Sequence, residues 1–173
     1  HMGYALVGLA AGTADGVRGV ILYILLYGAM TLGTFAVIVA MRRNEGPVEN
    51  IDDLAGLSRT HPVQAFLLAA LLFALAGIPP LSGFFAKFYV FLAAVQSGLY
   101  ALAVIGILAS VVGAYYYLRV VRIIYFDDPA ERLQPMRPEL RVILGLTGLF
   151  TVLYVFLAGP IAGVAEVAAK SLF

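Results

Sequence analysis

The sequence has no cysteine, and only 12% of its 173 residues are charged. The lack of cysteine excludes disulfide frameworks, thiolate metal sites and cysteine nucleophiles. Soluble domains usually carry about 25% charged residues, whereas 62% of this chain is hydrophobic. A soluble domain of this size leaves much of its surface in water, so we interpret the chain as an integral membrane protein. Its formal net charge of +1 argues against a nucleic-acid partner, which needs a clustered basic face.

Five apolar segments follow one another, and a transmembrane helix needs about 20 such residues. The first is too short to span a bilayer, and the third is too long for one simple span. We expect the Gly159-Pro160 pair to kink or end the fifth, before an apolar tail. The sequence predicts an all-α integral membrane fold with about four full transmembrane helices, a partial one at the N-terminus, and one helix broken at Pro79-Pro80. The segments cover residues 2–12, 20–41, about 62–96, 99–126, and 142 onward.

Charged residues are concentrated in the connections between these segments. Arginines gather in residues 42–59 and 119–141, whereas the other connections carry few charges. The positive-inside rule therefore places both arginine-rich connections in the cytoplasm. A short amphipathic helix is expected on the membrane surface over residues 51–57. The chain is apolar almost from its first residue, without the basic region of a signal peptide, so we expect it to start inside a helix of a longer protein.

The third segment contains the strongest local signal, a predicted helix break. Pro79 and Pro80 remove two backbone donors and clash with the preceding turn. Gly77 permits the sharp change of direction, and Ser82 is expected to cap the helix that restarts at Gly83. We predict two half-helices, over residues 63–77 and 83–96.

Once the charges in and beside the connections and the tail are set aside, Lys87 is the charged residue that remains within the predicted spans, about one turn past the restart. A lysine at the centre of a membrane helix costs roughly 2.5 to 3.5 kcal/mol. Desolvation disfavours its charged form, so it could accept and release a proton as its surroundings change. The alternative is that Lys87 snorkels to an interface, but a snorkelling lysine needs no double proline. We therefore favour a proton relay.

Other polar residues carry weaker signals. His1 is a second relay candidate, because histidine titrates nearest neutral pH, although a His-Met start is also typical of a cloning remnant. Tyr23, Tyr27 and Thr31 recur at helical spacing and could line a polar path, with a packed interhelical stripe as the favoured alternative. The consecutive tyrosines at 115–117 are expected in an interfacial aromatic belt. The sequence shows no phosphate loop, metal cluster or nucleophile constellation, so we expect no cofactor or metal in this chain.

The stretch LAGIPPLSGFFAKFYV at 75–90 resembles the broken, lysine-bearing helix of the antiporter-like membrane subunits of respiratory complex I, NADH-quinone oxidoreductase. Further motifs favour the subunit N family over its paralogues: HMGY at 1–4, LGTFA at 32–36, DLAGL at 53–57 and AYYYLR at 114–119. The resemblance covers the whole chain and implies that residues 1–173 are a single membrane domain, the C-terminal part of a longer subunit. It also implies that Lys87 belongs to the second half-channel of a proton pathway and that His1 lies on a central polar axis.

The resemblance implies a proton-translocating subunit that couples quinone reduction by NADH to proton transfer across the membrane. FMN, iron–sulfur clusters and quinone would belong to partner subunits. Other membrane subunits of complex I and the lipid bilayer would be its partners, and a bacterial inner membrane its multi-pass location. One alternative is a subunit of a multi-subunit cation/proton antiporter, which shares the broken helix and lysine. The other is a structural scaffold, with Lys87 facing lipid headgroups or beside a fixed carboxylate.

Overall fold

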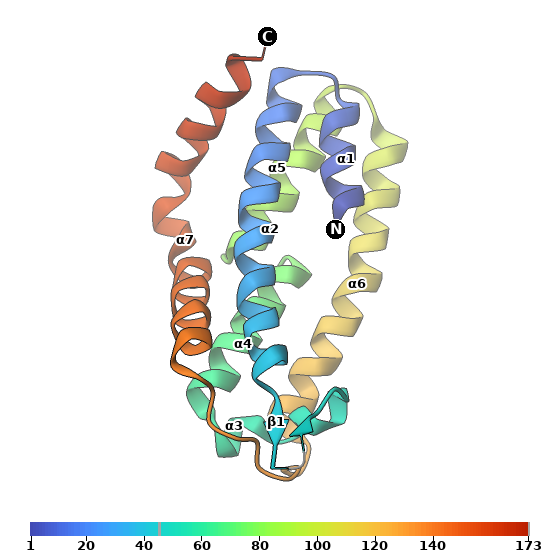
Figure 1. Ribbon diagram of the computed structural model, residues 1–173. Helices are drawn as coiled ribbons and strands as arrows, with labels where there is room; N and C mark the ends of the chain where they lie inside the picture. The colour runs from blue at the N-terminus through green and yellow to red at the C-terminus, as the bar shows by residue number, and fades with distance from the viewer. Residues whose placement is uncertain (45, 173) are drawn as a thin grey trace.

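The apolar segments fold into helices in the computed structural model, which describes residues 1–44 and 46–172 (Figure 1). Three helices are long and apolar enough to cross a membrane, and two shorter apolar helices accompany them. The two shorter helices lie on either side of the predicted break. The all-α membrane fold is therefore confirmed. In chain order the elements are α1 (Met2–Ala10), α2 (Ala14–Ala40), β1 (Arg42–Arg43), β2 (Gly46–Pro47), the 3-10 helix η1 (Ile51–Leu54), α3 (Leu57–Thr60), α4 (Pro62–Ala76), α5 (Ser82–Gln96), α6 (Tyr100–Phe126) and α7 (Pro138–Lys170).

Helix α2 is the central element of the bundle (Figure 1). It packs against α7, α5, α1 and α4, while α4 also packs against α6 and α7. Strands β1 and β2 form an antiparallel hairpin. This hairpin, α3 and the α6–α7 connection gather at one end of the bundle, which we call the arginine-rich end (Figure 1). The α1–α2 turn, the α5–α6 turn and the C-terminus lie at the opposite end (Figure 1). This alternation agrees with the orientation expected from the charge pattern.

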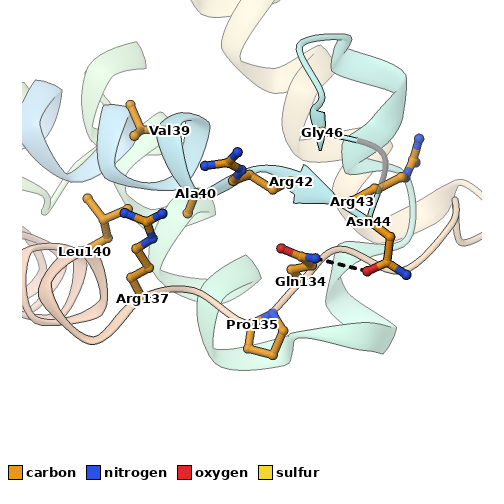
Figure 2. A pocket seen from close by; sticks show the side chains of 10 residues that line it. All are labelled: Val39, Ala40, Arg42, Arg43, Asn44, Gly46, Gln134, Pro135, Arg137 and Leu140. Carbon is orange, nitrogen blue, oxygen red and sulfur yellow. Dashed lines mark hydrogen bonds between the residues drawn. The ribbon is translucent and has the colours of Figure 1, made fainter.

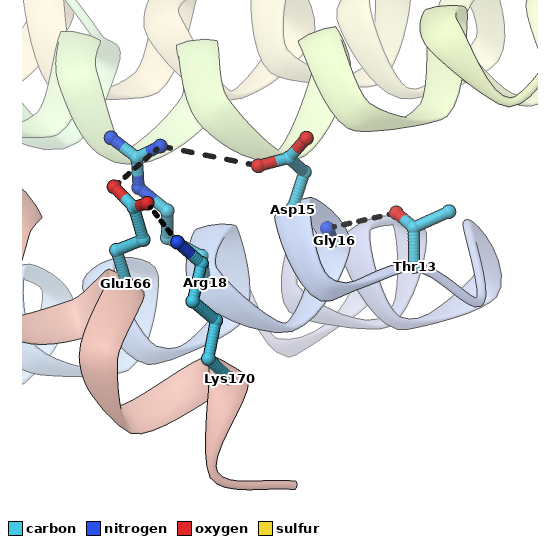
Figure 3. Close-up of polar contacts among 6 residues, drawn as sticks. All are labelled: Thr13, Asp15, Gly16, Arg18, Glu166 and Lys170. Atoms are coloured by element: carbon cyan, nitrogen blue, oxygen red, sulfur yellow. Dashed lines mark hydrogen bonds and ion pairs between the residues drawn. The ribbon is translucent and has the colours of Figure 1, made fainter. Parts of the chain in front are cut away.

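At the opposite end, ion pairs join α2 to α7 (Figure 3). Arg18 lies 3.9 Å from Asp15 in its own helix and 3.8 Å from Glu166 of α7. Lys170 binds the same glutamate at 2.7 Å. The side chain of Arg18 is only 23% exposed, and this arginine also lies over the ring of Tyr89 in α5. The network therefore ties the C-terminal half of α7 to the central helix.

Three boundaries differ from the sequence prediction. Helix α2 begins at Ala14 rather than near residue 20, because the Thr13 hydroxyl accepts a hydrogen bond from the Gly16 N–H and caps it. Helix α7 continues through Pro160, so of the two predicted outcomes, a kink or an end, the end does not occur. Proline removes one backbone hydrogen bond, and contacts with neighbouring helices can compensate for that loss in a membrane. The helix expected over 51–57 is instead η1 and α3, separated by Gly56 in the left-handed conformation at φ +62°.

Candidate functional site

The site begins at the break between α4 and α5. Helix α4 ends at Ala76, and Gly77 follows at φ +93°, in the left-handed region that favours glycine. The N–H of Gly77 bonds the carbonyls of Phe73 and Ala74, and the N–H of Ile78 bonds Phe73 at 3.0 Å. These bonds close the last turn of α4 and turn the chain toward α5, which begins at Ser82.

The two prolines leave two specific carbonyls of α4 without helical partners. In an α-helix the N–H of residue i bonds the carbonyl of residue i−4. The carbonyls of Leu75 and Ala76 would therefore require the N–H groups of residues 79 and 80. Both positions are proline, which has no N–H. The sequence thus frees a pair of acceptors at the end of α4.

Lys87 binds that pair of carbonyls. Its Nζ donates to the carbonyl oxygens of Leu75 at 3.0 Å and Ala76 at 2.9 Å. Its third bond, at 2.7 Å, is to the hydroxyl of Ser110 in α6. The partial negative charge at a helix C-terminus favours a cation, and the two carbonyls of the break together with Ser110 satisfy all three N–H groups of the ammonium. No carboxylate within 1–44 and 46–172 forms an ion pair with this lysine.

Two small residues bring the half-helices together. A Cβ at Gly83 would overlap the carbonyl oxygen of Ala74, so the first turn of α5 approaches the last turn of α4 more closely than any side chain allows.

Ser82 does not cap α5, contrary to the prediction. The helix starts one residue earlier than expected, with Leu81 at the N-cap position, and the fully buried Ser82 hydroxyl has no hydrogen-bond partner among the described residues.

An aromatic cluster links Lys87 to His1. The Tyr4 ring centroid lies 5.3 Å from Lys87 Nζ and 5.7 Å from the His1 ring. The His1 ring contacts the hydroxyls of Tyr23 and Tyr117, each at 2.7 Å, through Nδ1 and Nε2 respectively. It also stacks on Tyr27, with ring centroids 4.8 Å apart. Four helices, α1, α2, α5 and α6, therefore contribute to one connected polar and aromatic cluster.

A cavity of about 310 Å³ extends from this cluster toward the arginine-rich end. His1 and Tyr27 line it, as do Thr31, Thr34 and, in the loop before η1, Glu49. The rest of its wall is mainly apolar. The cavity leaves room for water beside His1. Lys87 Nζ needs no such water, because three protein oxygens already bind it.

The family of NADH:quinone oxidoreductase/Mrp antiporter transmembrane proteins matches residues 1–113. The chain belongs to this family. Among its relatives, "NADH-quinone oxidoreductase subunit N 1" of Rhizobium meliloti (strain 1021) is 61% identical over 174 residues, covering 100% of the chain and 36% of the relative. Subunit N of Parvibaculum lavamentivorans is 58% identical over 99% of the chain and 36% of the relative. The chain thus spans about a third of the length of the curated relatives it matches.

Two solved structures share the fold. A chain of respiratory complex I from Thermus thermophilus with bound aureothin superposes with a TM-score of 0.80 at 26% identity, over 92% of this chain and 36% of that one. A chain of the Mrp complex from Dietzia sp. DQ12-45-1b gives a TM-score of 0.80 at 22% identity, over 98% and 40% of the two chains. The second likeness concerns the fold alone.

Sequence reasoning missed three residues that contact Lys87 or His1, namely Tyr117, Ser110 and Tyr4. Tyr117 was assigned to the aromatic belt, but it points into the bundle and contacts His1, whereas its neighbours Tyr115 and Tyr116 are 73% and 51% exposed. Ser110 gave no signal in the sequence, because a serine within a long apolar helix is usually satisfied by its own backbone. Tyr4 follows His1 by one helical turn, and that spacing could have identified it.

Proposed function

We propose that Lys87 is a proton relay in a proton-translocating membrane subunit of NADH-quinone oxidoreductase. The observation that carries the proposal is the set of three oxygens around Lys87 Nζ, with no carboxylate partner among the described residues. A fixed carboxylate would hold the lysine permanently charged, whereas neutral acceptors leave both protonation states accessible.

The three partners can serve both states of the lysine. The ammonium donates three hydrogen bonds, to two carbonyls and to the Ser110 hydroxyl. When Lys87 releases a proton, its neutral amine keeps two N–H groups for the carbonyls of Leu75 and Ala76. Its lone pair then accepts from Ser110, since a hydroxyl can both donate and accept. Ser110 reverses its role, and no buried partner is left unpaired.

His1 supplies a means of control. Histidine changes charge near neutral pH, and the His1 ring and Lys87 Nζ both lie close to the Tyr4 ring centroid, at 5.7 and 5.3 Å. A positive charge on the imidazole disfavours the nearby ammonium, so protonation of His1 promotes proton release from Lys87. In this proposal, charge changes driven by quinone reduction elsewhere in the complex reach Lys87 through His1 and its tyrosines.

The wider context is also proposed. Residues 1–173 form one membrane domain, the C-terminal part of a longer antiporter-like subunit in a bacterial inner membrane. Its partners are other membrane subunits of complex I, and FMN, iron–sulfur clusters and quinone lie in partner subunits. The 61% identity to a relative named as subunit N supports this assignment.

The test uses the full-length protein in its assembled complex, reconstituted into liposomes. Lys87→Ala should lower proton uptake per NADH oxidised, while assembly, checked by co-migration of the subunits, persists. Lys170 is the matched control, because it is the other lysine of the chain and is exposed in an ion pair with Glu166. Ser110→Ala keeps the lysine and both carbonyls and should give an intermediate loss. Normal pumping by Lys87→Ala contradicts the proposal.

A cation/proton antiporter subunit is the second candidate, favoured by the shared fold of the Mrp complex chain. Purification of the native assembly separates the two. Flavin and iron–sulfur subunits should accompany the protein if it belongs to complex I, whereas sodium-antiporter subunits would reverse the assignment. A scaffold role predicts that Lys87→Ala and Lys170→Ala have the same effect on pumping.

A further inference from the structure

A second site lies at the arginine-rich end, far from the helix break. A cavity of about 370 Å³ opens between the C-terminal end of α2, the hairpin, and the connection that leads into α7 (Figure 2). Three arginines contribute to its wall. None of its described lining residues is acidic. The residues are Val39, Ala40, Arg42, Arg43, Asn44, Gly46, Gln134, Pro135, Arg137 and Leu140.

The three arginines differ in their partners. Arg43 is engaged elsewhere, since it binds Asp53 at 2.9 Å and Glu131 at 3.5 Å, and Figure 2 shows its guanidinium directed away from the other two. The guanidinium groups of Arg42 and Arg137 extend toward the same side of the cavity (Figure 2). Neither forms an ion pair with a described carboxylate, unlike Arg18, Arg43, Arg59 and Arg122. Two like charges that face one cavity repel each other, and an anion bound between them would lower that repulsion.

The walls of the cavity are fixed in place. The N–H of Gln134 donates to the carbonyl of Arg42 at 2.8 Å, and its side-chain amide donates to Asn44 Oδ1 at 3.0 Å (Figure 2). These bonds join the hairpin to the α6–α7 connection. The fold therefore holds the backbone segments that carry Arg42 and Arg137 next to one another, with both side chains exposed to an anion.

The depth of the cavity identifies the class of anion. It lies where α2 ends at Ala40 and α7 begins at Pro138, the boundary between apolar helix and polar connection. Val39, which is 64% exposed, and the half-buried Leu140 form its apolar side. A soluble anion gains nothing from this apolar wall, whereas a phospholipid places its phosphate on the arginines and its acyl chains against the two helices. Basic pockets between transmembrane helices at the cytoplasmic surface suit anionic headgroups.

We propose that this cavity binds the headgroup of an anionic phospholipid, with Arg42 and Arg137 contacting the phosphate. The site goes beyond proton translocation and does not depend on it, because it requires only that the chain be inserted in a membrane. A bound lipid would join α2 to α7 at the arginine-rich end, as the ion pairs of Arg18 do at the opposite end.

The test is photolabelling of the full-length protein with its native partners in phosphatidylcholine nanodiscs. The probe is phosphatidylglycerol with a diazirine on an acyl chain, and labelled peptides are mapped by mass spectrometry. The probe should label the ends of α2 and α7 around the cavity. Unlabelled phosphatidylglycerol should compete, whereas phosphatidylcholine and inorganic phosphate should not. Arg42→Gln with Arg137→Gln should weaken association roughly 30-fold, and each single change about five-fold, from ~1 kcal/mol for each arginine near the surface.

The control is Arg119→Gln with Arg122→Gln, which removes the same charge from α6 at the same end of the bundle without touching the cavity. It should leave labelling at the cavity unchanged. Equal loss in the two double variants would mean that net charge, not this cavity, recruits the lipid. Equal competition by phosphatidylcholine, or displacement by inorganic phosphate, also overturns the proposal. The single variants keep the test decisive if the double variant fails to fold.

Discussion

Alanine substitutions at two glycines in left-handed turns distinguish the effect of backbone strain from the effect of contact with Lys87. Gly77 has φ +93° and Gly98 has φ +75°, and each follows the end of a short apolar helix. Alanine in this region costs about 1–2 kcal/mol. At Gly98 an added Cβ meets nothing within 4 Å, whereas at Gly77 it would lie 3.1 Å from Lys87 Cδ and 3.2 Å from Nζ. The two substitutions therefore share one cost, and only Gly77→Ala adds a second.

The second cost arises because the added Cβ would disturb the hydrogen bonds of Lys87. Nζ must move by a few tenths of an ångström, although its bonds to Leu75 and Ala76 are already 3.0 and 2.9 Å long. Loss of one hydrogen bond to a charged group costs about 1.5–3 kcal/mol, which is a tenfold change or more in the balance between the charged and neutral amine. We expect Gly77→Ala to lose more unfolding free energy than Gly98→Ala, by about the cost of that hydrogen bond, and only Gly77→Ala to lose proton pumping.

The assay combines denaturant unfolding of the full-length protein in detergent with proton uptake by the reconstituted complex. Equal stability and equal pumping of the two variants would refute the reasoning, because contact with Lys87 would then be irrelevant. If both variants lose pumping in proportion to their stability, strain alone is the cause.

Other contacts give further expectations. Gly83→Ala forces the half-helices apart and should lower the unfolding free energy by about 1–3 kcal/mol. Gly163→Ala, in open space on α7, should not, and equal midpoints in denaturant would contradict the argument. Arg43→Gln leaves a largely buried aspartate unpaired and should speed hydrogen exchange in the hairpin, whereas Arg59→Gln, which breaks an exposed pair, should leave it unchanged. The pKa of His61 is lowered from 6.5, first by burial and then by a nearby arginine. The unfolded chain therefore binds more protons, and stability should decline as pH falls below about 6.5 and level off below the folded pKa. His61→Gln should remove this decline in unfolding titrations, and an unchanged decline would assign it to another group.

Local backbone chemistry made the helix break predictable from the sequence. Pro79 and Pro80 lack donors, and Gly77 accepts the left-handed turn, whatever surrounds them. The half-helices therefore end within one residue of the predicted boundaries. Ser82 failed as a cap because a shift of one residue moves a side chain from the N-cap position into the first turn. Helix ends are specified only to within such a shift.

The partners of Lys87 and His1 depend on which helix faces meet, and sequence spacing does not determine this. Ser110 lies 23 residues from Lys87, and Tyr117 lies 116 residues from His1. Three consecutive tyrosines point in three directions around α6, and only packing against α1 decides which one enters the bundle. Tyr23 and Tyr27 have the spacing for either a polar path or a packed stripe, and their contacts with the His1 ring follow from the packing of α1 on α2.

The double proline and the lysine act as one unit. Without Lys87, the carbonyls of Leu75 and Ala76 would be buried acceptors with no helical donor, at a cost of about 1–3 kcal/mol each. Without the prolines, a continuous helix would use both carbonyls, and the lysine would lack two of its three acceptors in an apolar surrounding. Each feature is unfavourable alone, and together they satisfy one another. Because the acceptors are neutral carbonyls, this mutual satisfaction also holds when the lysine is uncharged, as the proposed proton relay requires.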